Sequence, residues 1–168
     1  ASRLVEPEIQ CQPHRSPSPE RTRAVTAGLR WSPSGKTIAF AHSSGVIHLW
    51  DSAQNAVTMS MQGHEYGVND MAWSPTGSRI ISGSDDETAR IWNIQTGKTT
   101  ATLQGHAQPV DHVALSPVSS HAAVALNDGS LFLWDMKTGQ PVHVLKGHKN
   151  PIKALAWSAD GKHLASSD

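Results

Sequence analysis

The chain has 168 residues, with fourteen basic and fourteen acidic side chains, so its formal net charge at pH 7 is zero. This balance provides no extended basic surface, and nucleic acid and anionic membranes are therefore not expected partners. Charged residues make up 17% of the chain, against roughly 25% in an average soluble domain, and 38% of the residues are hydrophobic, which predicts one soluble globular domain.

The single cysteine, Cys11, cannot form a disulfide within the chain, which favours an intracellular protein over a disulfide-stabilised secreted one. No stretch approaches the roughly 18 consecutive apolar residues of a membrane-spanning helix. Glu6, Pro7 and Glu8 lie where a signal peptide would be apolar. We therefore expect a cytoplasmic or nuclear protein that does not associate with membranes.

Residues 1–24 are predicted to form a flexible, proline-rich leader, because four prolines in this segment disfavour both helix and central strand. Ser16 and Ser18 each precede a proline, which makes them candidates for proline-directed phosphorylation. A solvated tether is the simpler interpretation of the same segment. Residues 25–168 differ from this leader because they repeat.

The repeat has a period of 42 residues and is visible in three columns of the sequence. Trp50, Trp92 and Trp134 form one column, and Gly-His pairs at 63–64, 105–106 and 147–148 form a second. A third column places tryptophan at 31, 73 and 157, with Leu115 at the remaining position. Six tryptophans on two columns of one lattice indicate a repeated structural unit.

Each unit is predicted to contain four short strands separated by turns rich in proline, serine and glycine. The first, second and fourth strands are expected at 26–31, 37–41, 68–73, 79–83, 99–103, 110–115, 121–125, 141–145, 152–157 and 163–167. Third strands near residues 47–49, 89–91 and 131–133 alternate with period two, which predicts one buried face. Four strands in 42 residues leave no room for a crossover helix, so neighbouring strands should pair antiparallel.

Gly-His, followed by Trp-Ser-Pro-x-Gly and then by Ser-Gly-Ser-Asp-Asp-Glu-Thr-x-Arg-Ile-Trp-Asn, resembles the WD-repeat β-propeller family. The resemblance covers residues 22–168. It implies an all-β fold, an incomplete β-propeller of four-stranded antiparallel blades, with three full repeats and a truncated fourth over residues 25–168. It also implies that the outermost strand of one blade begins the next repeat unit.

The resemblance further implies a structural hydrogen-bond network in each unit, formed by a histidine, a hydroxyl, an aspartate and a tryptophan. The second unit has the complete set, the third has Val124 in place of the hydroxyl, the fourth stops early, and the first keeps only Trp50. The residues expected in this network are His64, Ser82, Asp86, Trp92, His106, Asp128, Trp134, His148 and Ser166.

No enzymatic activity, cofactor or metal is expected. The ten histidines lack the spacing of metal ligands, and no glycine-rich phosphate loop precedes a helix. His64, Ser82 and Asp86 have the residue types of a hydrolytic triad, but the resemblance implies that they are buried and lack an oxyanion hole.

The expected function is that of a scaffold or adaptor that binds other proteins or peptides through loops at one rim. A regulatory or sensor module of a larger signalling protein, with its catalytic domain elsewhere, is the alternative. The chain is expected to be a fragment, whose open blade edge indicates missing chain or self-association. The candidate partner-binding residues are Glu65, Tyr66, Asp85, Glu87, Gln108, Asn127, Lys149 and Asn150.

Overall fold

The computed structural model describes residues 26–168, which fold into fourteen β-strands without any helix. The predicted leader lies outside the described residues. The described part contains no helix long and apolar enough to cross a membrane. The strands are β1 (Thr26–Trp31), β2 (Thr37–His42), β3 (Ile47–Asp51), β4 (Ala56–Met61), β5 (Val68–Trp73), β6 (Arg79–Ser84), β7 (Ala89–Asn93), β8 (Thr99–Leu103), β9 (Val110–Leu115), β10 (His121–Leu126), β11 (Leu131–Asp135), β12 (Gln140–Leu145), β13 (Ala154–Trp157) and β14 (Leu164–Ser167).

These strands form four antiparallel sheets, which we call blades 1 to 4. Blades 1, 2 and 3 contain four strands each, in the chain order β1–β4, β5–β8 and β9–β12, and blade 4 contains β13 and β14. The all-β fold with four-stranded antiparallel blades is thus confirmed. β13 begins two residues later than expected, at Ala154, and the last backbone bond of the pair joins the Lys153 amide to the Ser167 carbonyl.

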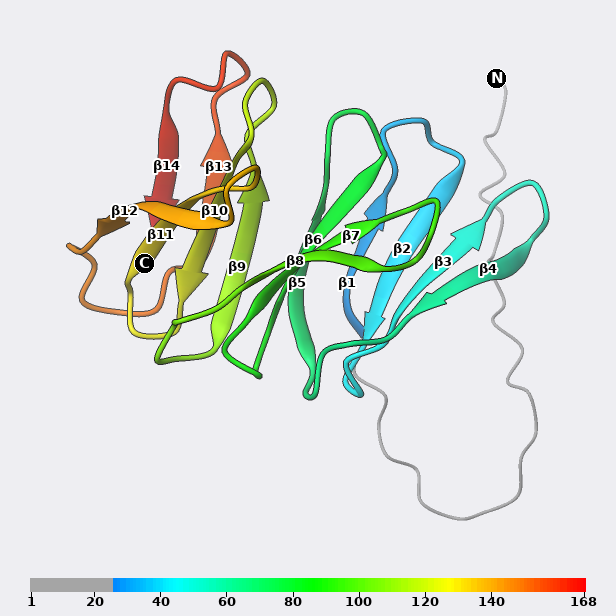
Figure 1. Cartoon of the computed structure of the whole chain (residues 1–168), viewed down its shortest axis with the longest axis horizontal. Coiled ribbons are helices and arrows are strands. Elements are labelled where there is room, and N and C mark those ends of the chain that lie inside the picture. The colour runs from blue at the N-terminus through cyan, green and yellow to red at the C-terminus, as the bar shows by residue number, and fades with distance from the viewer. Residues whose placement is uncertain (1–25) are drawn as a thin grey trace, which may run out of the picture.

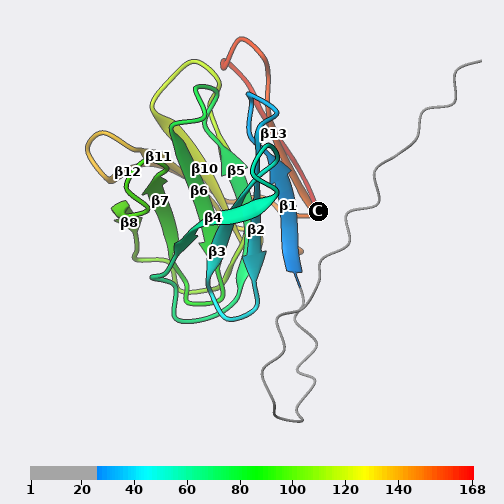
Figure 2. The ribbon, with the colours of Figure 1, turned by 90° about the vertical axis from the view of Figure 1, so that its right-hand side faces the viewer.

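The blades stand side by side in chain order and fan out without closing into a ring (Figure 1). Their first strands, β1, β5, β9 and β13, each contact the next, and they form the inner side of the fan. Figure 2 shows β1 and β13 on one side of the molecule and the outer strands β8 and β12 on the other. The structure is therefore an open segment of a propeller.

The main hydrophobic clusters lie between blades rather than on one side of each sheet. Trp92 of blade 2 is fully buried and packs with Ile47 and Met61 of blade 1. Leu103 of blade 2 packs in the same way against Val124 and Trp134 of blade 3. The expected alternation is confirmed in β3 and β7, where His48 and Arg90 are less buried than the residues on either side of them. Beyond the expected range, Trp92 points to the face opposite Ile91 and is buried as well. Stacked blades cover both faces of an internal sheet.

Gly83 shows how closely the blades approach one another. A Cβ atom at this position would lie 2.3 Å from Cγ1 of Val110 in the next blade, well inside van der Waals contact. Only glycine allows β6 and β9 to pack at this distance. This contact sets the spacing of β6 and β9, and with it the position of the loops at their ends.

Candidate functional site: the histidine rim

Blade 2 contains a continuous hydrogen-bonded relay from the sheet to a loop. Trp92 Nε1 donates to Ser82 Oγ at 2.8 Å, and Ser82 Oγ lies 2.7 Å from His64 Nε2. His64 Nδ1 lies 2.8 Å from a carboxylate oxygen of Asp86. Ser82 and Trp92 come from the neighbouring strands β6 and β7, whereas His64 comes from the loop between β4 and β5 and Asp86 from the turn between β6 and β7. The relay therefore ties two loops to the sheet.

The donors fix the direction of this relay. An indole N–H can only donate, so Ser82 Oγ accepts from Trp92 and donates its own hydrogen to His64 Nε2. His64 is then the neutral tautomer that carries its proton on Nδ1 and donates it to Asp86. Burial lowers the pKa of His64 despite the neighbouring carboxylate, so the contact is a hydrogen bond rather than an ion pair near pH 7.

Asp86 is held as a carboxylate by several donors. Burial opposes its charge, but hydrogen bonds from Thr88, from His64 and from the backbone amide of Glu65 outweigh this effect and lower the pKa of Asp86. Each of these bonds restrains a rim loop. The carboxylate thus organises the loop before β5 as well as the turn between β6 and β7.

Serine, histidine and aspartate here have the hydrogen-bonding order of a hydrolytic triad, but Ser82 cannot reach a substrate. Its side chain is fully buried, and its Oγ atom already accepts the Trp92 indole. A nucleophile needs an open path to a carbonyl carbon and donors for the developing oxyanion. The arrangement is suited to holding loops in place.

The relay does not form in blade 3, where Val124 stands in place of the serine. His106 Nε2 and Trp134 Nε1 are buried and have no hydrogen-bond partner. His106 Nδ1 donates to the Glu87 carbonyl of blade 2, at 3.1 Å, rather than to Asp128. Asp128 instead accepts the backbone amide of Ser130, within its own turn. The structure therefore does not join His106, Asp128 and Trp134 into one network.

Blade 4 builds a related network with a different acid. His148 Nε2 lies 2.8 Å from Ser166 Oγ, and His148 Nδ1 lies 3.1 Å from a carboxylate oxygen of Asp168. The hydrogen bond from His148 lowers the pKa of Asp168. The residue two repeat periods before Asp168 is Ser84 of blade 2. The repeat pattern therefore did not indicate that Asp168 would pair with the histidine. In blade 1, Phe40 instead stacks on His48, with ring centroids 5.1 Å apart.

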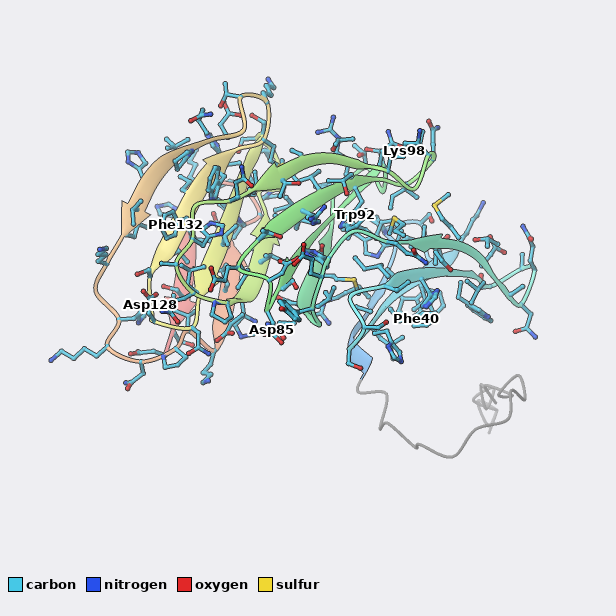
Figure 3. All side chains as sticks on the ribbon, turned by 60° about the horizontal axis from the view of Figure 1, so that its bottom comes forward. Phe40, Asp85, Trp92, Lys98, Asp128 and Phe132 are labelled. Carbon is cyan, nitrogen blue, oxygen red and sulfur yellow. The ribbon has the colours of Figure 1, made fainter. Side chains whose placement is uncertain are left out.

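The loops that carry these histidines gather at one end of the blades, which we call the histidine rim. It comprises the connections β2–β3, β4–β5, β6–β7, β8–β9, β10–β11 and β12–β13. Figure 3 shows Asp85 and Asp128 on this rim, with Lys98 at the opposite end of the blades. All eight candidate partner-binding residues are exposed there: Glu65, Tyr66, Asp85, Glu87, Gln108, Asn127, Lys149 and Asn150.

Backbone bonds between successive loops make the rim rigid. The Asp85 amide donates to the Gly67 carbonyl at 3.0 Å, and the Asn127 amide donates to the Pro109 carbonyl at 3.1 Å. The Asp85 side chain also takes part in a hydrogen bond on the rim, which Asn69 donates at 2.7 Å. Tyr66 remains 61% exposed. The rim therefore presents fixed polar groups around one large, accessible aromatic ring.

Glu87 has an unusual backbone conformation on this rim. Its φ angle is 64°, while the corresponding residues of blades 1 and 3 are Gly45, with φ of 81°, and Gly129, with φ of 83°. A side chain in the left-handed region is destabilising by roughly 1 kcal/mol. The strained residue projects a carboxylate from the rim where its neighbours have no side chain.

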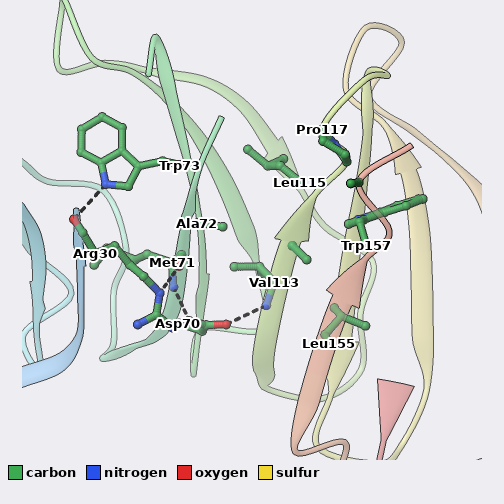
Figure 4. A pocket seen from close by; sticks show the side chains of 12 residues that line it. Arg30, Asp70, Met71, Ala72, Trp73, Val113, Leu115, Pro117, Leu155 and Trp157 are labelled. Carbon is green, nitrogen blue, oxygen red and sulfur yellow. Dashed lines mark hydrogen bonds and ion pairs between the residues drawn. The ribbon is translucent and has the colours of Figure 1, made fainter. Parts of the chain in front are cut away.

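A second network, on the inner strands, was not expected from the sequence (Figure 4). Asp70 on β5 accepts a hydrogen bond from Arg30 on β1 at 2.7 Å and from the Val113 amide on β9 at 3.2 Å. Trp73 Nε1 donates to the Arg30 carbonyl at 3.0 Å. These bonds cross three blades beside an inner-strand pocket of about 450 Å³. The repeat pattern gave no signal, because the residues in register with Asp70 are Gly28, His112 and Ala154.

The described part of the chain has no group of three histidine, cysteine, aspartate or glutamate side chains placed to hold a metal ion. The contacts of His64 and of His148 described above are with serine and aspartate of the same blade.

Stability is expected to fall as the pH is lowered from 7.5 to 5. Burial lowers the pKa of His64, His106 and His48 below the ordinary value of 6.5. The folded chain therefore binds fewer protons than the unfolded chain in this window, and the free energy of unfolding decreases with acidification. The pKa of Asp86 is also lowered, but its carboxylate stops stabilising the fold only when the pH falls below the ordinary value of 3.8, outside this window.

Thermal melting across this pH range measures the effect. The variant His106→Gln should show a shallower dependence, because one of the buried imidazoles is gone. A melting temperature that is constant, or that rises on acidification, would contradict the assignment of neutral, buried imidazoles.

Comparison with known proteins identifies the repeats. The family model described as WD domain, G-beta repeat matches residues 55–93, 97–135 and 139–168. Each matched segment starts at or just before an outer strand, β4, β8 or β12, which confirms the offset between repeat and blade. No curated protein matches the chain. Repeats of this kind generally mediate protein–protein interaction and are typically non-catalytic. With three consecutive matched repeats, which run from the outer strand of blade 1 into blade 4, the chain belongs to the WD40 repeat family.

Proposed function

We propose that the chain is a protein-interaction scaffold or adaptor that binds partner proteins or peptides through the histidine rim. The observation that carries this proposal is the exposure of all eight candidate residues on loops that the relay and the inter-loop bonds hold in place. A prepositioned surface loses little conformational entropy on binding, which favours recognition. The single cysteine favours cytoplasm or nucleus as its location.

Two rim residues are the proposed anchors. Tyr66 offers an exposed aromatic ring with a polar tip, a combination that is enriched at the energetic centres of interfaces. Glu87 holds a charged side chain at a strained position, and such strain is concentrated at functional sites. We propose that the scaffold performs no reaction of its own, since the triad-like group found in the described part of the chain is buried beneath this surface.

Tyr66→Ala and Glu87→Gly are expected to reduce partner capture without unfolding the chain. Affinity capture from cell extract, quantified by mass spectrometry, should yield proteins that lose at least tenfold in recovery with Tyr66→Ala, as for an interface anchor worth about 2 kcal/mol. Glu87→Gly should weaken the same interactions while stabilising the fold by roughly 1 kcal/mol, because glycine relieves the positive φ.

Lys98→Ala is the matched control, because Lys98 is exposed in a turn at the opposite end of blade 2. It should leave capture unchanged. Equal recovery of every partner by the wild type, Tyr66→Ala and Glu87→Gly would exclude the histidine rim as the binding surface.

A further inference from the structure

Residues 104–108, between β8 and β9, form a loop that is held in place by one histidine side chain; we call it the His106 loop. Among the described residues, the only hydrogen bond that this loop makes outside the strands runs from His106 Nδ1 to the Glu87 carbonyl, at 3.1 Å. Pro109, which follows the loop, accepts the Asn127 amide through its carbonyl. The His106 ring is thus the attachment of the loop to the turn between β6 and β7.

The corresponding loop of the preceding repeat, residues 62–66, is attached by more bonds. Its histidine, His64, contacts Ser82 through one ring nitrogen and Asp86 through the other. Asp86 also accepts the backbone amide of Glu65 from the same loop, at 3.1 Å. Opening this loop would break all of these contacts, whereas opening the His106 loop breaks one.

Packing distinguishes the two loops in the same way. A Cβ atom on Gly63 would lie 3.0 Å from the Trp92 ring, whereas nothing lies within 4 Å of a Cβ atom on the corresponding Gly105. Gly105 has a φ angle of 99° and borders a pocket of about 400 Å³, which Phe132 and Trp134 help to line. The His106 loop therefore starts with a glycine that has free space beside it, about which the loop can turn outward.

The surroundings of the His106 ring accept only its neutral form. The residue is 7% exposed, and its ring makes T-shaped contacts with Phe132 and Trp134, at centroid distances of 4.9 and 5.5 Å. His106 Nε2 is buried and has no hydrogen-bond partner. A proton on Nε2 would create a buried charge and an N–H without an acceptor. Burial accordingly lowers the pKa of His106, although the bond to the Glu87 carbonyl opposes this effect.

Carboxylates are the charged groups that the elements around His106 bring to this end of the blades. On the turn between β6 and β7, on β9 and on the turn between β10 and β11, they are Asp85, Asp86, Glu87, Asp111 and Asp128. None of them forms an ion pair with His106. Arg90 of β7 and His112 of β9 lie instead beside Gly63 and Asp70. An imidazolium that leaves its buried position for the rim surface therefore meets negative charges, which favour the protonated, open loop.

We propose that His106 is a pH-dependent latch, which in its neutral form holds the His106 loop closed against Glu87 and on protonation releases the loop from blade 2. Protonated His64, in contrast, would keep Asp86 as its hydrogen-bond acceptor and gain a charge attraction to it. Release would move Gln108 and free the Glu87 carbonyl, so the shape of the histidine rim would change with pH. The latch is a property of the loop itself and does not depend on what the rim binds.

Relaxation dispersion of backbone amides in the full, ¹⁵N-labelled chain measures the ratio of open to closed loop. An imidazole that titrates at its ordinary value of 6.5 in the open loop, and not at all in the closed loop, raises this ratio about tenfold between pH 7.5 and 5.5. The amides of His106 and Glu87 should report the increase. The amides of β9 and β10 should not, which separates opening of the loop from unfolding of the blade.

Two substitutions test the imidazole, and each has a control. His106→Gln keeps an amide donor for the Glu87 carbonyl but cannot gain a proton, so its ratio should be equal at the two pH values. His143→Gln removes an exposed histidine of the same blade and should keep the tenfold increase. Val124→Thr offers a hydroxyl to His106 Nε2 and should lower the ratio about fivefold at both pH values, as for one hydrogen bond. Val124→Ala changes the size without adding a hydroxyl and should not lower it.

A wild-type ratio that does not change with pH, or the absence of exchange at pH 5.5, would overturn the proposal. A tenfold increase that persists in His106→Gln would overturn it as well, since another group would then be titrating. Equal exchange at the amides of β9 and β10 would assign the pH effect to unfolding of the blade and would also exclude the latch.

Discussion

Replacing Trp92 by alanine is expected to lower the free energy of unfolding by about 3–5 kcal/mol. The indole is fully buried between blades 1 and 2, so its removal leaves a large cavity in the packing between them. The substitution also leaves Ser82 Oγ without its indole donor. Denaturation by urea, followed by circular dichroism, measures the loss.

Trp31→Ala is the control for this prediction, because Trp31 belongs to the other tryptophan column and is 55% exposed. Its loss should change stability by less than about 1 kcal/mol. A loss below about 0.5 kcal/mol for Trp92→Ala would contradict the role of this indole in joining the two blades.

Exchanging the hydroxyl positions of blades 2 and 3 should have opposite effects on stability. Val124→Thr is expected to stabilise the chain by about 1–2 kcal/mol, since a hydroxyl at this position can accept from Trp134 Nε1 and donate to His106 Nε2, both of which are buried without a partner. Ser82→Val is expected to destabilise it by about 2–4 kcal/mol, because it leaves the equivalent pair in blade 2 unsatisfied. Differential scanning calorimetry of both variants provides the comparison.

Val113→Thr controls for the cost of adding a hydroxyl to the core. Val113 is a buried valine in the same cluster as Val124 and lies opposite it in the register of β9 and β10. This variant should be destabilised by about 1–3 kcal/mol. If Val124→Thr were destabilised to the same extent, the two buried nitrogens would not be its hydrogen-bond partners.

The repeat lattice predicted the strands because burial and turn geometry recur at every period. The expected ranges 68–73, 99–103 and 110–115 coincide with β5, β8 and β9. The second packed face of the third strands was not indicated, because period-two alternation reveals one packed face, whereas Trp92 is buried on the other face by a neighbouring blade. Packing between repeats is long-range information that the alternation within one strand does not contain.

The sequence predicted those hydrogen bonds of the candidate site that depend on the identity of one residue. The serine in blade 2 and the valine in blade 3 indicate where a relay can form, since only a hydroxyl both accepts and donates. The Glu87 carbonyl that receives His106, and the Asp168 carboxylate that receives His148, come from positions with no counterpart in the relay pattern. Such substitute partners depend on backbone placement, which only the folded chain determines.

Asp70 limits the modularity of this repeat protein. It joins β1, β5 and β9 through one carboxylate, yet it occurs in only one of the four units. Among the described blades, blade 2 is consequently the one that this carboxylate hydrogen-bonds to the blade before it and to the blade after it. Shuffling the units, or duplicating one of them, would separate this aspartate from the arginine before it and the amide after it, so the order of the units is itself part of what the sequence encodes.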